Sequence, residues 1–385
     1  MRAAIILGTR PEIIKLAPVM RALERDEYIL IHTEQHYDYE MNRIFLEELG
    51  LPEPDYNLHV GSGTQAVQTG KAMMKIEEVL MEEKPDVTIV QGDTNTVLAG
   101  ALASVKLHIP VAHVEAGLRS NDRTMPEEIN RIVTDHVSDV LFPPTEKAKE
   151  NLLGEGIPEE WIYVVGNTVV DAVLQHSAIA EEKSRILENL GLKDQEYAVV
   201  TAHRAENVDR KENLKKIVEI IRSVPIPVVY PVHPRTEKRL KVFRLWKELE
   251  GAENVILTEP LGYFDFLKLL KHARLVLTDS GGIQEEAITL HIPCITLRYT
   301  TERPETIEAG GNVLVGLEVE KAKKMVGKIL NDRDFEERMR SAPNPFGDGR
   351  AGERIAKMLR ELERRGKLEV HATTINSHSQ IRRRS

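Results

Sequence analysis

The sequence is poor in cysteine and has no long apolar run, and both absences narrow the class of protein. Cys294 is the single cysteine among 385 residues, so an intramolecular disulfide cannot form. It follows Pro293 in an apolar run, where a small thiol is expected to fill space in a core. No apolar stretch is long enough for a signal peptide or a membrane span. We therefore expect a soluble cytoplasmic protein without membrane contacts.

Positive charge is also scarce. The chain has 61 acidic and 52 basic residues, which gives a net charge of -9 at pH 7. Such a surface does not favour nucleic acid or anionic lipid, because both are negatively charged. Any phosphate group must therefore be bound by a few local cations.

The usual patterns of cofactor and metal sites are missing as well. The first strand is followed by G-T-R-P-E, in which Gly8 is the single glycine, so the G-x-G-x-x-G dinucleotide fingerprint is absent there. We therefore expect no nicotinamide cofactor. No histidine accompanies the acidic residues discussed below at a spacing typical of metal ligands, so we expect no metal centre either.

What is present is a regular alternation of short β-rich apolar runs with helical patterns, which is typical of parallel sheets with crossover helices. Strands are predicted at Ala3–Leu7, Tyr28–Thr33, Val87–Gln91, Pro110–Glu115, Val140–Phe142, Tyr197–Thr201, Pro227–Pro231, Val255–Leu257, Leu275–Thr278 and Cys294–Leu297. Helices in the first half are predicted at Pro11–Arg25, Tyr39–Leu49, Gln65–Glu83, Thr94–Lys106 and Pro126–His136.

The alternation restarts after Gly166-Asn167-Thr168, which predicts two domains. We expect an α/β protein in which two Rossmann-like domains, residues 1–166 and 167–350, face each other across a cleft. A helix within residues 351–366 is expected to close the domain pair, and residues 367–385 form a polar tail. Ligands in such sheets bind beyond the carboxyl ends of the strands.

The segment Leu277 to Ala287, L-T-D-S-G-G-I-Q-E-E-A, predicts a strand end, a tight turn and a helix start. Ser280 is a candidate N-cap, and Gly281 and Gly282 leave the backbone N–H groups open to a ligand. These groups and the helix dipole favour an anion such as a diphosphate. Glu286 lies about 9 Å further along the helix and could accept hydrogen bonds from ribose hydroxyls. The alternative is an ordinary strand-to-helix turn.

Three cations are candidates for binding that diphosphate from other segments. Arg10 and Lys15 flank the start of the first helix, where Pro11 suits the first helical position. Arg303 lies in T-T-E-R-P-E, from which its guanidinium could reach a phosphate or stabilise Glu286. For Arg10 or Lys15 taken alone, a solvated charge on a helix surface is the default interpretation.

Acidic residues follow the fourth and fifth strands. Asp93 in Q-G-D-T-N-T and Glu115 in H-V-E-A-G-L-R each stand just past a buried strand, where structure alone has little use for a carboxylate. Glu127 in M-P-E-E-I-N-R begins a helix, so a purely structural capping role is the stronger alternative for it. These three carboxylates are candidates for acid/base chemistry.

Two histidines follow successive strands of the second half, His203 in T-A-H-R-A-E-N and His233 in Y-P-V-H-P. One histidine after a strand is usually structural. Two of them, with an arginine beside them, indicate phosphate contact or proton transfer.

These motifs together resemble the non-hydrolysing UDP-N-acetylglucosamine 2-epimerases. The resemblance covers residues 1 to about 360 and includes G-T-R-P-E with Lys15, G-D-T-x-T, I-P-V-A-H-V-E-A-G-L-R, P-E-E-x-N-R, G-N-T, H-R-x-E-N, Y-P-V-H, D-S-G-G-I-Q-E-E-A, T-T-E-R-P-E and N-P-F-G-D-G. It implies a glycosyltransferase-B fold and a homodimer. It also implies reversible conversion of UDP-GlcNAc to UDP-ManNAc without an added cofactor, feeding cell-surface polysaccharide or glycan synthesis.

The resemblance also implies roles for individual residues. The acid/base and charge-stabilising positions are Asp93, Glu115, Glu127 and His203. The UDP-binding positions are Arg10, Lys15, His233, Ser280, Gly281, Gly282, Glu286 and Arg303. The uracil side matches Phe266 and the backbone of Leu261, where the family often has glutamine.

Bacterial relatives bind a second UDP-GlcNAc as an activator, and part of that site is present here. Gln35, His36 and Gln65 match its positions, whereas Asp38 stands where glutamine is common and no arginine directly precedes Gln65. These residues form a candidate regulatory site.

Other functions are compatible with parts of this pattern. Relatives that act on UDP-2,3-diacetamido sugars share nearly all of these motifs. A glycosyltransferase on the same scaffold would bind UDP in the same way but would need an acceptor site, and a hydrolysing epimerase usually carries a kinase domain. A non-catalytic binding module would not require Asp93, Glu115 and His203.

Overall fold

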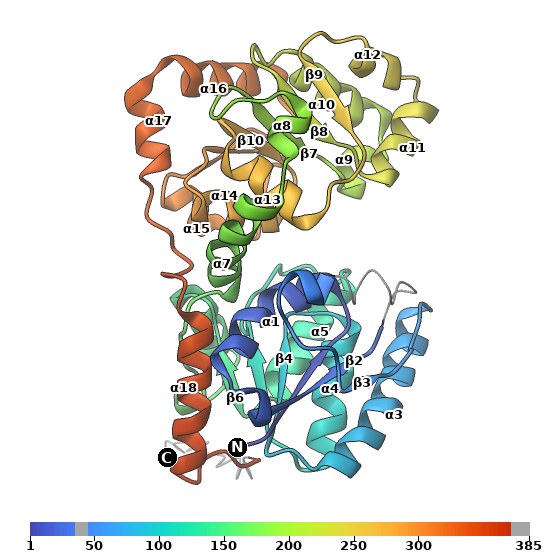
Figure 1. Ribbon diagram of the computed structural model, residues 1–385, viewed down its shortest axis with the longest axis vertical. Helices are drawn as coiled ribbons and strands as arrows, with labels where there is room; N and C mark the ends of the chain where they lie inside the picture. The colour runs from blue at the N-terminus through green and yellow to red at the C-terminus, as the bar shows by residue number, and fades with distance from the viewer. Residues whose placement is uncertain (35–44, 371–385) are drawn as a thin grey trace, which may run out of the picture.

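The computed structural model describes residues 1–34 and 45–370 of the protein. Two lobes lie one above the other along the longest axis, and each is built around its own parallel sheet (Figure 1). None of the helices described there is long and apolar enough to cross a membrane.

The first lobe contains a six-stranded sheet in the order β3-β2-β1-β4-β5-β6. Its strands are β1 (Ala3–Leu7), β2 (Tyr28–His32), β3 (Tyr56–Asn57), β4 (Val87–Gln91), β5 (Val111–Val114) and β6 (Val140–Phe142). Every strand pair is parallel. The sheet is doubly wound, so the strand order reverses between β1 and β4, which is where such folds bind ligands.

The second lobe repeats this arrangement in the order β12-β11-β10-β7-β8-β9, again with parallel pairs throughout. Its strands are β7 (Ala198–Thr201), β8 (Val228–Pro231), β9 (Val255–Thr258), β10 (Leu275–Thr278), β11 (Cys294–Thr296) and β12 (Asn312–Leu314). The corresponding reversal point lies between β7 and β10.

The helices cover the sheets and connect the lobes. In the first lobe they are α1 (Arg10–Ala22), α3 (Gln65–Glu83), α4 (Asn95–Lys106), α5 (Pro126–Val137) and α6 (Glu146–Gly154), with 3-10 turns η1 (Arg25–Glu27) and η2 (Glu159–Trp161). The remaining helices are α7 (Thr168–Lys183), α8 (Ile186–Leu190), α9 (Ala205–Val208), α10 (Lys211–Arg222), α11 (Pro234–Val242), α12 (Trp246–Glu250), α13 (Tyr263–Lys271), α14 (Gly281–Thr289), α15 (Pro304–Glu308), α16 (Val319–Asn331), α17 (Arg333–Arg340) and α18 (Ala351–Arg364).

The chain crosses between the lobes twice, and the two crossings meet. The backbone N–H of Asn167 donates to the carbonyl of Phe346 at 2.7 Å. The carboxylate of Asp171 accepts the N–H groups of Ala351 and Gly352, at 3.1 and 2.8 Å, and so caps α18. Helix α18 then returns to the first lobe and packs against α1 (Figure 1).

The two parallel six-stranded sheets confirm the predicted α/β class. The two strands that sequence patterns missed, β3 and β12, have only two and three residues and are partly exposed, so neither forms the buried apolar run that marked the equally short β6 and β11. Helix α1 ends at Ala22, earlier than predicted, because the chain leaves the helix and forms η1 before β2. Most of the predicted helix Tyr39–Leu49 lies outside the described residues, and residues 45–48 are helical.

Candidate active site

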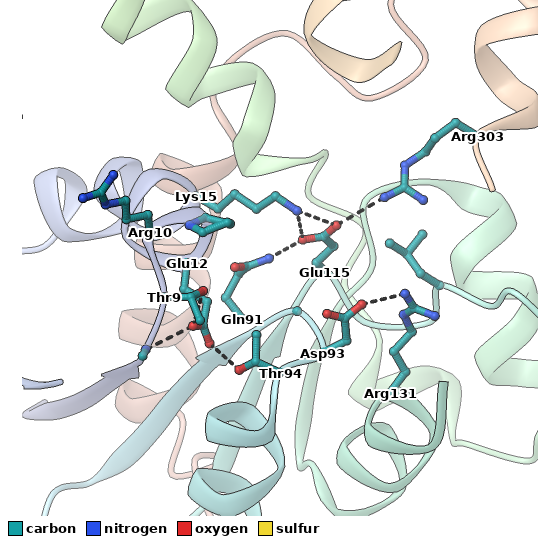
Figure 2. A pocket seen from close by; sticks show the side chains of 14 residues that line it. Thr9, Arg10, Glu12, Lys15, Gln91, Asp93, Thr94, Glu115, Arg131 and Arg303 are labelled. Atoms are coloured by element: carbon teal, nitrogen blue, oxygen red, sulfur yellow. Dashed lines mark hydrogen bonds and ion pairs between the residues drawn. The ribbon is translucent and has the colours of Figure 1, made fainter. Parts of the chain in front are cut away.

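A cavity of about 650 Å³ opens at the carboxyl edge of the first sheet, at the reversal point between β1 and β4. Figure 2 shows the side chains around it. The lining residues are Gly8, Thr9, Arg10, Pro11, Glu12, Lys15, Gln91, Gly92, Asp93, Thr94, Glu115, Leu118, Arg131 and Arg303. Of these, Arg303 alone comes from the second lobe.

Glu115 lies in the wall of this cavity and accepts hydrogen bonds from two side chains. Both of its oxygens accept from Lys15 Nζ, at 2.9 and 2.6 Å, and one also accepts from the side-chain amide of Gln91. Its backbone has φ +68°, a left-handed conformation that is strained for a glutamate. Strain of this kind gathers at functional sites, because it persists only where the surroundings hold it in place.

The charge state of Glu115 follows from its neighbours. Its side chain is only 5% exposed, and burial alone would raise its pKa. Lys15 and Arg303 outweigh burial and lower the pKa below its ordinary value. The cavity wall therefore carries an ionised carboxylate, although water barely reaches it.

A chain of alternating charges runs from this carboxylate into the second lobe. Arg303 lies 3.7 Å from a Glu115 oxygen through Nη2, and its Nε donates to a Glu285 oxygen at 2.5 Å. Glu285 is 1% exposed, and burial raises its pKa despite the opposing effect of Arg303. Both cations of this chain, Lys15 and Arg303, already have carboxylate partners. A phosphate that binds these cations would therefore have to compete with Glu115 and Glu285.

Asp93 is oriented by helix α5. Its carboxylate pairs with Arg131 Nη2 at 2.6 Å, and its backbone carbonyl accepts from the Asn130 amide at 2.9 Å. Arg131 is itself held by Glu128 at 2.8 Å, and Glu128 also accepts backbone N–H groups from Ser120 and Asn121. Within P-E-E-I-N-R, Glu128 therefore has the structural role, whereas Glu127 is half-buried and does not line the cavity.

Glu12 connects the two turns at the reversal point. Its carboxylate accepts from the Gly8 N–H at 3.0 Å, from the Thr9 hydroxyl at 2.7 Å and from the Thr94 hydroxyl at 2.8 Å. It is 2% exposed, and burial raises its pKa to about 7. This residue fixes the loop after β1 against the loop after β4, so it shapes the cavity floor.

The two histidines lie together at the carboxyl edge of the second sheet. The His203 and His233 rings are 5.5 Å apart between centroids. The backbone N–H of His203 donates to Asp279, a fully buried carboxylate that also accepts from the Asn207 amide at 3.0 Å. Burial, together with neighbouring cations, lowers the pKa of His203, so its ring is a neutral acid/base candidate. His233 is exposed and caps α11 through the Arg235 N–H.

The predicted anion site occupies the other side of the second reversal point. Ser280 is the N-cap residue of α14, as predicted, but its hydroxyl makes no capping hydrogen bond. A Cβ added at Gly281 or Gly282 would lie no closer than 3.8 Å to the atoms of other residues, so close packing does not require glycine at either position. The N–H groups of a first helical turn have no partner within the helix. They remain available to an anion.

Glu286 has an oxygen that is buried and lacks a hydrogen-bond partner in the described part of the chain. Burial and the nearby Glu285 raise the pKa of Glu286 to about 7. Arg303 pairs with Glu285 and not with Glu286, contrary to our expectation, because consecutive helical residues point about 100° apart. Glu286 is thus left free to accept from a ligand hydroxyl.

Predicted site residues outside these clusters lie as follows. Leu261 and Phe266 are half-buried in one apolar cluster on the second lobe. Gln65 is exposed at the start of α3, and Gln35 and His36 lie outside the described residues. The candidate regulatory site therefore stays a prediction.

The structure brings some of the predicted residues together and leaves others apart. Arg10, Lys15, Asp93, Glu115 and Arg303 line one cavity. Its lining does not include the following candidates: Glu127, His203, His233, Leu261, Phe266, Ser280, Gly281, Gly282 and Glu286.

Sequence reasoning missed five polar residues of the lining, which are Thr9, Glu12, Gln91, Thr94 and Arg131. Gln91 is the last residue of a predicted strand, and Arg131 lies inside a helix. Glu12 had the clearest available signal, since it is an acid directly after Pro11 in a first helical turn.

Comparisons with known proteins agree with this geometry. Residues 21–360 match the family model described as UDP-N-acetylglucosamine 2-epimerase. A UDP-N-acetylglucosamine 2-epimerase of Methanocaldococcus jannaschii is 57% identical over 367 residues, covering 93% of this chain and 99% of that protein. A UDP-2,3-diacetamido-2,3-dideoxy-D-glucuronate 2-epimerase of Pseudomonas aeruginosa is 43% identical over 373 residues, covering 94% and 100%.

Solved structures show the same likeness. The crystal structure of the M. jannaschii UDP-GlcNAc 2-epimerase in complex with UDP-GlcNAc and UDP has a TM-score of 0.82 at 56% identity. The match covers 94% of this chain and 100% of that one. The two-lobed arrangement described above is therefore shared with proteins of this kind.

Proposed function

Because the chain belongs to the UDP-N-acetylglucosamine 2-epimerase family, we propose that it interconverts UDP-GlcNAc and UDP-ManNAc by inverting the hexose C2. The observation that carries this proposal is Glu115, an ionised, backbone-strained carboxylate held between Lys15 and Arg303 in the cavity wall. A protein that only bound a sugar nucleotide would have no need to maintain a charge under such constraint.

The chemistry requires the groups that the two lobes supply. The C2 proton is not acidic, because its neighbour C1 is an acetal carbon. The C1–O bond must therefore break, leaving its electron pair on UDP, while C2 gives its proton to a base and a C1–C2 double bond forms. Re-addition of UDP to C1, with protonation of C2 from the opposite face, gives the epimer. The balance is complete without a redox cofactor.

We assign the roles accordingly. Asp93, Glu115, Glu127 and His203 supply proton transfer and charge stabilisation. The UDP binds to Arg10, Lys15, His233, Ser280, Gly281, Gly282, Glu286 and Arg303, with Leu261 and Phe266 on the uracil side. Support for this division comes from the open helix N-terminus and the unpartnered Glu286 oxygen in the second lobe. It also comes from Glu115 in the first lobe, whose pKa is lowered by Lys15 and Arg303 despite its burial.

Incubation with UDP-GlcNAc in deuterated water, followed by proton NMR, tests the reaction. We expect deuterium at C2, a mixture of both epimers and no early net release of UDP. Release of UDP as the main product would show a hydrolase instead. Turnover that depends on an added sugar acceptor would show a glycosyltransferase.

A modified sugar is the second candidate substrate, because the P. aeruginosa diacetamido relative is 43% identical along nearly the whole chain. Parallel assays with UDP-GlcNAc and a UDP-2,3-diacetamido sugar decide between them. A much higher kcat/KM for the second compound would transfer the assignment to it.

We also propose a homodimer, for which α3 offers a surface. Val67, Met74 and Met81 are 49%, 58% and 59% exposed and lie seven residues apart, on one stripe of the helix. A two-fold axis at Met74 would pair antiparallel copies of α3, with Val67 against Met81. It would also place exposed Lys71 against exposed Glu77, so the stripe is complementary to itself in charge.

Sedimentation equilibrium tests this interface. Met74→Glu places two like charges at the two-fold axis and should yield monomers, whereas Val242→Glu, at an exposed apolar residue of α11, should remain dimeric. A monomeric wild-type protein would refute the homodimer, and a dimeric Met74→Glu variant would refute the interface.

We place the protein in the cytoplasm, which agrees with its one cysteine being a buried free thiol. Recovery of the native protein from a secreted or membrane fraction would contradict this.

A further inference from the structure

His113 and Asp135 are buried directly behind the two loops that carry Asp93 and Glu115. His113 belongs to β5 and is fully buried, and Asp135 belongs to α5 and is 1% exposed. Neither residue lines the cavity, so neither can contact a substrate there. Their contacts nevertheless reach both loops.

Both nitrogens of the His113 ring face acceptors. Nδ1 lies 2.7 Å from Asp135 Oδ1, and Nε2 lies 2.9 Å from the carbonyl oxygen of Gly92. A carbonyl oxygen only accepts, so Nε2 must carry a proton. An ionised carboxylate only accepts as well, so Nδ1 must carry one too, unless the proton has moved to Asp135.

The surroundings of Asp135 favour its ionised form. Its second oxygen accepts the Gly117 N–H at 3.1 Å and pairs with Arg119 Nη1 at 2.7 Å. Burial alone would raise the pKa of Asp135, but His113 and Arg119 lower it below its ordinary value. Arg119 in turn pairs with Glu155 at 2.7 Å. With an imidazolium at His113, the buried His113–Asp135 pair is neutral, and Arg119 and Glu155 form a second neutral pair that extends from it to the exposed Glu155. Pairing of this kind is the condition under which charges are tolerated in a core.

The cluster reaches the two catalytic loops through their backbones. Gly92, whose carbonyl accepts from His113, directly precedes Asp93. Gly117, whose N–H donates to Asp135, follows Glu115 by two residues. The backbone of Gly117 packs so closely against α6 that a Cβ there would lie 2.3 Å from the Ala148 carbonyl oxygen. The strained backbone of Glu115 thus has a fixed anchor on its C-terminal side.

We propose that His113 is a doubly protonated imidazolium which, with Asp135, holds the Asp93 loop and the Glu115 loop in register as a positioning pair. Its charge state does not depend on the proposed function, whereas its effect on turnover does. This charge state differs from that of an exposed histidine, which is mostly neutral near pH 7.

Neutron diffraction from crystals of the perdeuterated wild-type protein at neutral pH tests the charge state without any substitution. We expect deuterons on both ring nitrogens of His113 and none on Asp135. A single ring deuteron, or one on the Asp135 carboxyl, would overturn the proposal.

Steady-state kinetics of Asp135→Asn tests the positioning role. The asparagine keeps the shape but provides no charge for the imidazolium, so kcat should fall on the order of 10- to 100-fold, as expected for misplaced catalytic groups. KM and UDP affinity should stay near wild type. Glu155→Gln is the matched control, because it removes the same charge at the outer end of the cluster, where Glu155 pairs with Arg119. The contacts of His113 and Asp135 with Gly92 and Gly117 stay intact, so this variant should retain turnover.

An unchanged kcat in Asp135→Asn would refute the positioning role, and so would a loss of kcat matched by an equal loss of UDP affinity. If the wild-type protein showed no epimerisation while both ring deuterons were present, the proposed function would fail and the assignment of the imidazolium would stand.

Discussion

The two lobes share one strand order but prepare the edges of their sheets differently. At the first edge, Asp93 and Glu115 each have a cationic partner before any ligand arrives. At the second, the first turn of α14 presents open N–H groups, and Glu286 has a buried oxygen without a partner in the described part of the chain. A satisfied, rigid edge suits chemistry, whereas an edge with unused donors and acceptors suits binding. With the roles that we propose, the same topology supports two tasks, because function depends on the residues placed on it.

The largest effect should come from the first edge. Asp93→Asn or Glu115→Gln keeps the shape but removes a charge that the proposed proton transfers need, so kcat should fall on the order of 10²- to 10⁴-fold. UDP affinity should change far less. In Glu115→Gln it should even increase, since Lys15 and Arg303 lose the carboxylate that competes with phosphate. Steady-state kinetics with calorimetric titration of UDP separates the two quantities.

Glu150→Gln is a suitable control, because it removes an exposed carboxylate of the same lobe and should behave as wild type. Near-normal turnover in both cavity variants would end the catalytic assignment of this edge.

Sequence patterns could locate these residues but not their pairings. Asp93 and Glu115 were found because a carboxylate after a buried strand is conspicuous. Arg131 was not, because a helix position gives no indication of which loop its guanidinium reaches. Arg303 was found with a phosphate or Glu286 as its possible partner, whereas it pairs with Glu285. The choice between Glu285 and Glu286 depends on the rotation of α14 against the loop. The positions of strands and helices and the number of lobes follow from local periodicity, whereas ion pairs follow from tertiary placement.

The second edge should affect binding, and the effect should depend on pH. In Glu286→Gln, UDP affinity should fall about tenfold, the size expected when hydrogen bonds to a charged acceptor are weakened. Burial first, and then Glu285, raises the pKa of Glu286 to about 7. Ribose hydroxyls donate to the ionised form, so wild-type affinity should increase as pH rises through that value.

Titrations of UDP across this pH range, compared between the wild type and Glu286→Gln, isolate the carboxyl group from the ionisation of the phosphate itself. The difference between the two curves should grow with pH. Parallel curves would show that Glu286 does not contact the nucleotide.

The smallest effect on turnover is expected at Glu12. Its carboxylate supports the first edge by accepting hydrogen bonds from Gly8, Thr9 and Thr94. Burial raises its pKa from 4.5 to about 7. Between these values the folded protein binds a proton that the unfolded chain lacks, so this group's contribution to stability is present at low pH and is lost as pH rises toward 7.

Glu12→Gln removes that pH dependence, which amounts to at most about 3 kcal/mol in the free energy of unfolding for a shift of this size. The Tm of the variant, relative to that of the wild type, should therefore increase as pH rises from 5 to 7. Calorimetry of both proteins across this pH range measures the difference. Glu219→Gln, an exposed carboxylate on α10, should show no such trend. A constant difference between Glu12→Gln and the wild type would mean that Glu12 is ionised throughout, and that the turns after β1 and β4 are held by charge-assisted hydrogen bonds.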